Sequence, residues 1–130
     1  MLEVKNISKY YGSKRAIENI SFSAARGQII GLVGHNGSGK TTTMSIITNC
    51  LAPDGGSVML DGVSAQTDPV KLRSKIGYLP EIPPVYTDMT VDEQLSFACG
   101  LKGLPRVEYE GQIAAACEKL NITGVRGRLI

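Results

Sequence analysis

The sequence predicts an α/β fold in which an antiparallel β part leads into a glycine loop and a helix, before the chain becomes helical. Apolar and polar residues alternate over residues 2–8 and 16–24, which is the pattern of half-buried strands. Residues 28–33 are mostly apolar and are followed at once by the loop GHNGSGKT, which starts at Gly34. After a proline-rich joint, the apolar residues recur at helical spacing instead.

Turn residues separate the elements of the β part. The stretch YYGSKR joins the first two strands, and the alternation of the first strand slips near Asn6. Residues 28–33 are apolar on both faces, which is typical of a central strand covered by other elements. Two further short strands are predicted at residues 57–60, closed by an Asp-Gly turn, and at residues 75–79, ended by Pro80.

Caps and apolar periodicity predict the helices. The first runs over about residues 40–50, and one or two helical turns follow later, capped by Thr67 or Asp68 with Pro69 at the first helical position. A capping-box pattern at Thr90 opens a helix that ends near residue 101. Another helix begins near Pro105, and its expected apolar stripe comprises Ile113, Ala116, Cys117 and Leu120.

Composition indicates a soluble globular protein and excludes several kinds of site. Of the 130 residues, 42% are hydrophobic and 20% charged, and the net charge is +2 with the two signs interspersed, so no nucleic-acid surface is expected. The N-terminus lacks a signal-peptide pattern, which favours a cytoplasmic location. With 3 cysteines at wide spacing and 1 histidine, a zinc site is not expected.

The loop fits the phosphate-binding pattern G-x-x-x-x-G-K-[ST], with Gly34, Gly39, Lys40 and Thr41 at its fixed positions. It follows a predicted strand and opens a predicted helix, which is the context the pattern requires. Glycines let successive backbone N–H groups converge on an anion, and the helix N-terminus adds partial positive charge. The pattern therefore predicts a P-loop NTPase core that binds a nucleoside triphosphate with Mg²⁺.

Each position of the loop has an expected role. The Lys40 ammonium reaches the terminal phosphates, the Thr41 hydroxyl ligates Mg²⁺, and the Thr42 hydroxyl bonds a phosphate oxygen. The remaining members of the cofactor-binding loop are His35, Asn36, Gly37 and Ser38. The loop alone does not choose between GTPases, kinases, helicases and transport ATPases.

Longer stretches make that choice, because they resemble the nucleotide-binding domain of ATP-binding cassette (ABC) transporters in the correct order. They are SKYYGSKRAIENISFSAARGQIIGLVGHNGSGKTTTM, APDGGSVMLDG and KIGYLPEIPPVYTDMTVDEQLSFACGLKG, which together span most of the chain. The resemblance is to bacterial exporter-type ATPase subunits whose membrane partner is a separate chain. It implies a β part and P-loop core over residues 1–80, a glutamine-loop-like joint over 81–90, and the start of a helical subdomain over 91–130.

The resemblance assigns two further site residues. Tyr11 matches the aromatic residue that stacks on adenine, with Tyr10 as the alternative. Glu81 stands where the family usually has a glutamine that reaches Mg²⁺ and the attacking water, so it is expected to join the metal shell and, with Lys40, the catalytic set. A carboxylate there would ligate Mg²⁺ but would also repel the phosphates.

The family pattern also includes segments that this sequence lacks. No LSGGQ-like signature, no apolar strand ending in two acidic residues and no switch histidine occurs; His35 lies inside the loop. We therefore expect a truncated chain, the N-terminal half of a longer ATPase, that binds Mg-ATP but does not turn it over alone.

The resemblance implies the partners as well. The longer protein is expected to form a head-to-tail dimer around ATP and to drive a membrane permease, lying at the inner face of the plasma membrane. Residues 81–93 would face the permease. The alternatives are a non-transport ABC ATPase and a nucleotide-binding fragment without turnover.

Overall fold

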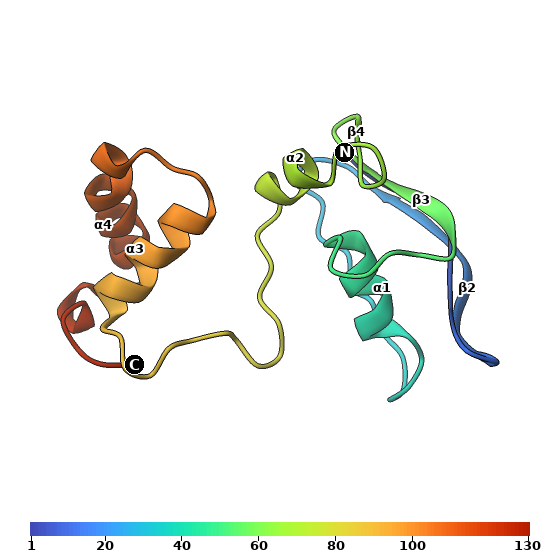
Figure 1. The fold of residues 1–130 in the computed structure, drawn as a ribbon, viewed down its shortest axis with the longest axis horizontal. Helices are drawn as coiled ribbons and strands as arrows, with labels where there is room; N and C mark the ends of the chain where they lie inside the picture. The colour runs from blue at the N-terminus through green and yellow to red at the C-terminus, as the bar shows by residue number, and fades with distance from the viewer. The chain divides into compact units, whose positions relative to one another are not determined.

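The computed structural model describes all 130 residues, which form two compact units, Met1–Tyr78 and Leu79–Ile130 (Figure 1). The first unit contains β1 (Leu2–Tyr11), β2 (Lys14–Ala24), α1 (Lys40–Ile47), β3 (Gly55–Leu60), β4 (Val63–Ser64) and α2 (Pro69–Ser74). The second contains α3 (Val91–Leu101), the 3₁₀ turn η1 (Arg106–Glu108), α4 (Tyr109–Lys119) and the 3₁₀ turn η2 (Thr123–Val125). The predicted α/β fold is confirmed.

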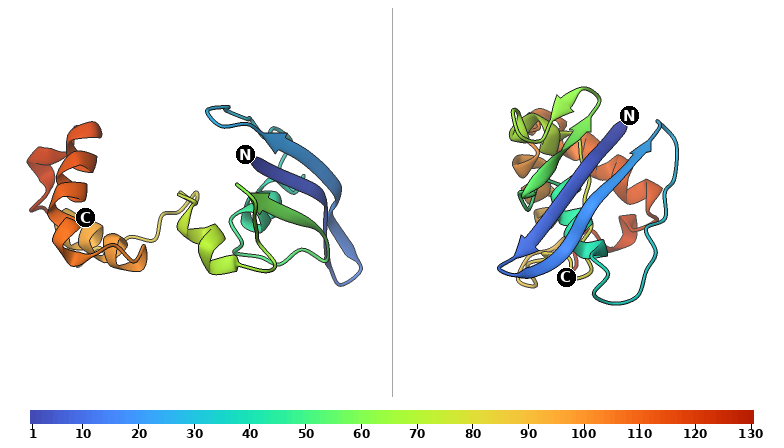
Figure 2. Two further views of the ribbon diagram at one scale, coloured as in Figure 1. Left: turned by 90° about the horizontal axis from the view of Figure 1, so that it is seen from above. Right: turned by 90° about the vertical axis from the view of Figure 1, so that its right-hand side faces the viewer.

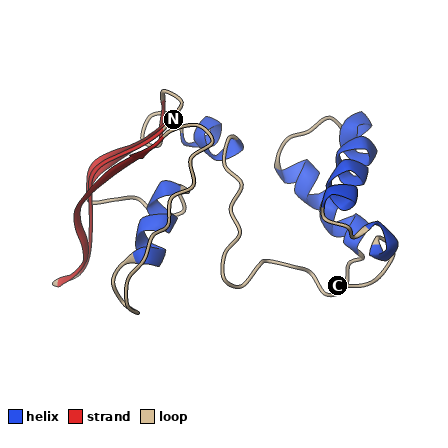
Figure 3. Cartoon of the chain, turned by 180° about the vertical axis from the view of Figure 1, so that it is seen from behind, coloured by secondary structure: helices blue, strands red, loops and turns tan.

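A four-stranded antiparallel sheet forms one side of the first unit, with strand order β2-β1-β3-β4 (Figure 3). The β1–β2 hairpin is long and ends at the pair Tyr11↔Lys14. Its register shifts between Val4 and Ile7, where Asn6 adopts a φ of 49°, so the predicted slip near Asn6 is confirmed. Asparagine tolerates this left-handed conformation better than most residues do.

Helix α1 packs against one face of this sheet, and α2 closes the same core (Figures 1 and 2). Burying each aliphatic side chain contributes roughly 1.5–3 kcal/mol. An apolar pocket of about 360 Å³ remains between α1 and the sheet, bordered by Phe22, Leu32 and Met44. The buried core residues are Val4, Ile7, Ile17, Ile46, Ile47, Val58, Val63, Ala65 and Leu72.

Two predicted strands are wrong. Residues 28–33 and 75–79 form no strand and pair with none. Ile29 is 96% exposed and Val33 91% exposed, so the first of these segments is not a covered central strand. An apolar run becomes a strand only where a neighbour supplies backbone partners, and none of the four strands pairs with either segment.

The caps of α2 and α3 follow the sequence closely. Asp68 caps α2, accepting a hydrogen bond from Lys71 N at 3.2 Å, with Pro69 at the first helical position. Thr90 and Glu93 form the predicted capping box of α3, in which Thr90 Oγ1 accepts from Glu93 N and Glu93 Oε2 accepts from Thr90 N. These local patterns place two helix starts correctly.

Arg126 ties the second unit together. Its Nε donates to Asp92 Oδ1 at 2.7 Å, and its two terminal nitrogens donate to Glu110 at 3.0 Å each. The hydrogen bonds to Glu110 and then Asp92 raise the pKa of Arg126 above its usual value. Thus one guanidinium joins the starts of α3 and α4.

The last predicted helix differs in detail. The chain makes the 3₁₀ turn η1 first, and α4 begins only at Tyr109. Ile113 and Cys117 are buried as expected, but Leu120, the C-cap of α4, is exposed. None of the helices combines the length and apolar character that crossing a membrane requires.

Candidate functional site

The glycine loop runs from Gly34 into the first turn of α1. Gly37 and Gly39 have φ angles of 80° and 89°, in the left-handed region, and Ser38 N donates to His35 O at 3.2 Å to close a turn. Gly39 is the N-cap residue and brings no capping side chain. The first intrahelical hydrogen bond is Thr43 N to Gly39 O at 2.8 Å, so the preceding amides of the first turn point out of the helix.

Gly39 also lies directly on β2. A Cβ added to Gly39 would collide with Ile17 Cγ2 and lie 2.8 Å from Ala16 O. Only glycine therefore combines this φ with this close approach. The contact fixes the loop on the sheet, and no feature of the sequence links Gly39 with Ile17.

Lys40 folds back over the loop. Its Nζ donates to Gly34 O at 2.7 Å and to His35 O at 2.8 Å. An ammonium group has three donors, so one remains for an anion at the loop. Lys40 is half-buried, which keeps its charge close to the loop backbone.

The loop therefore has the physical properties of an anion site. The first turn of α1 contains no acidic residue, so the partial positive charge of the helix N-terminus is not offset. Thr41 is exposed and Thr42 half-buried in this turn, which directly follows the loop. His35 and Asn36 are exposed, and His35 Nδ1 lies 2.9 Å from Asn36 O. Such a nest of amides and a lysine suits a polyphosphate.

The two candidate aromatic residues differ in their surroundings. The Tyr10 hydroxyl donates to Glu18 Oε1 at 3.2 Å, and this hydrogen bond raises the pKa of Tyr10. Tyr11, at the end of the hairpin, is 52% exposed. The hairpin end and the glycine loop lie at the same end of the first unit (Figures 1 and 2). The environment therefore favours Tyr11 over Tyr10 as a platform for a base.

Glu81 belongs to the second unit, where it is exposed on a bend. The loop residues Gly34–Thr42 belong to the first unit. The role of Glu81 remains a prediction.

A magnesium ion would fit the loop as a companion of a polyphosphate. The chain has no group of three or more His, Cys, Asp or Glu side chains placed to hold a metal on their own. Mg²⁺ commonly takes one or two protein ligands and completes its octahedron with phosphate oxygens and water. Thr41, exposed in the first turn of α1, would supply one such ligand through its hydroxyl.

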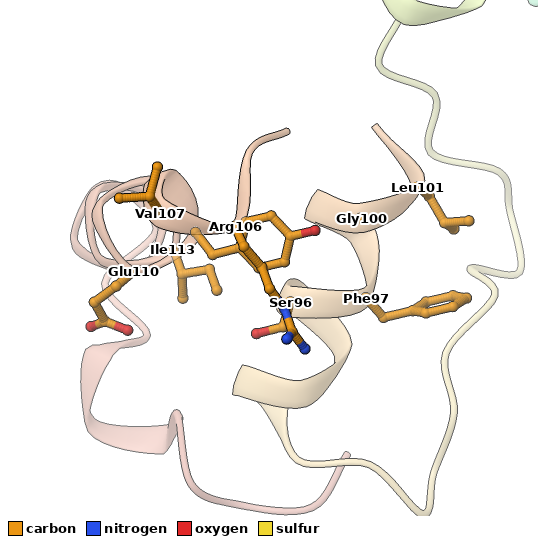
Figure 4. Close-up of a pocket in the computed structure, with 9 residues that line it drawn as sticks. Ser96, Phe97, Gly100, Leu101, Arg106, Val107, Glu110 and Ile113 are labelled. Atoms are coloured by element: carbon orange, nitrogen blue, oxygen red, sulfur yellow. The ribbon is translucent and has the colours of Figure 1, made fainter. Parts of the chain in front are cut away.

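A second hollow, of about 820 Å³, lies in the second unit between α3 and the start of α4 (Figure 4). It is bordered by Phe97 and Leu101 from α3 and by Arg106, Glu110 and Ile113 from the other side. It has neither a glycine loop nor a helix N-terminus free of acidic side chains, since Glu110 lies in the first turn of α4. The glycine loop is the stronger candidate for phosphate binding.

The comparisons with known proteins agree with this geometry. A family model described as ABC transporter matches residues 17–130. The chain belongs to the ABC transporter family. The match includes the whole glycine loop, most of the first unit and all of the second, so the predicted resemblance is confirmed.

Relatives within the ABC transporter family are named as ATP-binding proteins. The chain is 35% identical to the linearmycin resistance ATP-binding protein LnrL of Bacillus subtilis over 123 residues, which are 95% of this chain and 40% of that protein. It is 34% identical to the ABC-type transporter ATP-binding protein EcsA of the same organism, covering 87% of this chain and 46% of that protein. The chain thus spans less than half the length of these ABC relatives.

Solved ABC structures have the same fold. An ATP-binding subunit of an ABC transporter superposes with a TM-score of 0.86 at 29% identity, covering 99% of this chain and 54% of that one. The protein cbiO1 from Clostridium perfringens, described as part of the ABC transporter complex cbiONQ, superposes with a TM-score of 0.83 at 23% identity. It covers 98% of this chain and 53% of that one, and shows the fold alone.

Proposed function

We propose that this chain binds Mg-ATP through Gly34–Thr42 as the ATP-binding part of an ABC transporter. One observation carries the proposal: the loop, with two left-handed glycines, is fixed on β2 and opens a helix whose first turn carries a lysine and no acid. The convergent amides would hold the phosphates, and the third donor of Lys40 would bond a terminal phosphate oxygen.

The neighbouring side chains would complete the site. The Thr41 hydroxyl would ligate Mg²⁺, and Thr42 would bond a phosphate oxygen. Tyr11 would stack on the adenine, which by analogy with other base–aromatic contacts is worth about 1–3 kcal/mol. Glu81 would join the metal shell.

In a chain of its relatives' length, we propose that bound ATP is hydrolysed and that hydrolysis drives a permease in the membrane. Two such subunits would enclose ATP head to tail at the inner face of the plasma membrane. The residues that position the attacking water would come from segments that these 130 residues lack, so residues 1–130 alone should bind Mg-ATP without hydrolysing it. Residues 1–80 would correspond to the family's core, 81–90 to its glutamine loop and 91–130 to its helical subdomain.

Calorimetric titration with Mg-ATP tests the proposal. We expect binding by the unmodified chain and no measurable binding by Lys40→Ala, because the lysine supplies the only ammonium held by the loop carbonyls. Lys71→Ala is the matched control, since Lys71 is exposed on α2. Equal affinities for all three proteins would contradict the assignment of the loop. Steady hydrolysis by residues 1–130 that Lys40→Ala abolishes would contradict the proposed lack of turnover.

A further inference from the structure

The hairpin end that carries Tyr11 extends beyond its neighbouring strand. Strand β3 pairs with β1 only as far as Ser8↔Gly55, whereas β1 continues to Tyr11 with β2 alone beside it. A two-stranded hairpin without a third strand or a packed face is only marginally stable. The position of Tyr11 therefore depends on what supports the free edge of β1.

Asp54, the residue before β3, supplies that support through three hydrogen bonds. Its N donates to Ser8 O at 2.9 Å, which continues the backbone ladder by one step. Its Oδ2 accepts from Tyr10 N at 2.7 Å, and its Oδ1 accepts from Lys9 Nζ at 2.9 Å. Asp54 thus contacts three consecutive residues of β1, Ser8 through its backbone N–H and Lys9 and Tyr10 through its carboxylate, and the bond from Tyr10 N takes the place of one bond from the missing strand.

Both side-chain bonds are strong ones. A charged acceptor makes a hydrogen bond about twice as strong as a neutral pair does. The Lys9 side chain is only 14% exposed, whereas the Asp54 side chain is 41% exposed, so water screens their ion pair in part.

The segment between α1 and Asp54 is itself well ordered by hydrogen bonds. Thr48 Oγ1 donates to Met44 O at 2.9 Å, and Leu51 N donates to Ser45 O at 3.1 Å. Asp54 therefore connects the helix that starts at the phosphate loop with the hairpin end. The contact of Gly39 with Ala16 and Ile17 is a second connection between the same two parts.

We propose that Asp54 is a positioning residue for Tyr11, holding the aromatic ring at a fixed place relative to the phosphate loop so that it stacks on the base of a bound nucleotide. This inference rests on the proposed ATP site. It gives Asp54 a role in recognising the base and none in binding the phosphates.

The test compares a ligand that has a base with one that does not. Dissociation constants for Mg-ATP and Mg-tripolyphosphate are measured for Asp54→Ala. We expect about threefold to tenfold weaker binding of ATP, a fraction of the stacking contribution, and tripolyphosphate binding unchanged within about twofold. Asp54→Asn keeps an acceptor for Tyr10 N but loses the charge, so its loss for ATP should be smaller, about twofold to threefold.

Two controls separate positioning from general stability. Glu3→Ala removes a different ion pair of β1, with Lys5 at 2.6 Å, and should leave both affinities unchanged. In a Tyr11→Ala background, Asp54→Ala should cause no further loss specific to ATP, because the ring it positions is absent. If Asp54→Ala fails to fold, as judged by circular dichroism, the same two dissociation constants are measured for Asp54→Asn, in the unmodified chain and in the Tyr11→Ala background.

The outcomes distinguish this inference from the proposed function. If the unmodified chain binds neither ligand, both the proposed ATP site and the proposed role of Asp54 are wrong. If Tyr11→Ala weakens ATP alone but folded Asp54 variants bind ATP normally, or lose both ligands equally, the ATP site stands and the positioning role is overturned. A loss at Asp54 that persists in full without Tyr11 would also overturn it.

Discussion

Replacing Gly39 by alanine perturbs the site at the point where the loop meets β2. The φ of 89° costs a residue with a side chain about 1–2 kcal/mol. The added Cβ collides with Ile17 Cγ2 and lies 2.8 Å from the backbone oxygen of Ala16, and overpacking of this kind costs about 1–3 kcal/mol. Together these terms predict that the folded, ligand-bound form of Gly39→Ala is about 2–5 kcal/mol less stable, relative to the unfolded chain and free ligand, than that of the unmodified chain.

Gly37→Ala is the matched control, because it keeps the backbone term and lacks the collision. Gly37 has a φ of 80°, and a Cβ there would have no neighbour within 4 Å. We therefore expect Gly37→Ala to cost about 1–2 kcal/mol. The difference between the two variants isolates the contact between the loop and β2.

The assay combines calorimetric titration of Mg-tripolyphosphate with urea unfolding of each variant. The loop of Gly39→Ala can relieve the collision by moving away from β2, in which case the cost appears in the affinity. It can also stay in place, in which case the cost appears in the free energy of unfolding. The sum of the two losses should exceed that of Gly37→Ala by about 1–3 kcal/mol. Equal sums would refute the reasoning that Gly39 fixes the loop on the sheet.

Three further predictions concern the fold. Leu72 is fully buried under the sheet, so Leu72→Ala should lower the free energy of unfolding by about 2–5 kcal/mol in urea titrations; a loss below 1 kcal/mol would contradict its place in the core. Thr90→Ala removes the cap of α3 and should cost about 0.5–2 kcal/mol, seen as a lower melting temperature, whereas Thr90→Ser should retain the cap. The hydrogen bond from Lys9 and then that from Tyr10 N lower the pKa of Asp54, so this carboxylate stabilises the fold above its unfolded pKa of about 3.9, and the contribution is lost as the pH falls through the lower folded value. The melting temperature should therefore drop below about pH 4. If the melting temperature of Asp54→Ala drops by the same amount on acidification, that result would count against the ion pair.

Features that depend on neighbours in the sequence could be predicted. The spacing of glycines and the lysine located the loop that opens α1, and the cap residues Asp68 and Thr90 located two helix starts. The slip near Asn6 was also visible, because alternation of side chains along a strand reports its register directly. Each of these patterns involves residues only a few positions apart.

Features that depend on distant residues could not be predicted. Apolar character at residues 28–33 indicated a strand, but strand formation requires a partner that the periodicity does not reveal. The support of Tyr10 by Asp54 joins residues 44 apart in the sequence, and Arg126 reaches Asp92 across 34 residues. Such pairs of charged or polar residues have no characteristic spacing, so they emerge only from the folded chain.

The central claim is that backbone amides at the start of α1 converge on a polyphosphate. The most direct measurement is an NMR titration of the ¹⁵N-labelled chain with Mg-ATP, following each amide. The account predicts that the largest shifts occur at Gly37 and at residues 39–42, and that Mg-tripolyphosphate reproduces them. It would be contradicted if these amides stayed unmoved while ATP shifted amides elsewhere, such as those around the hollow between α3 and α4.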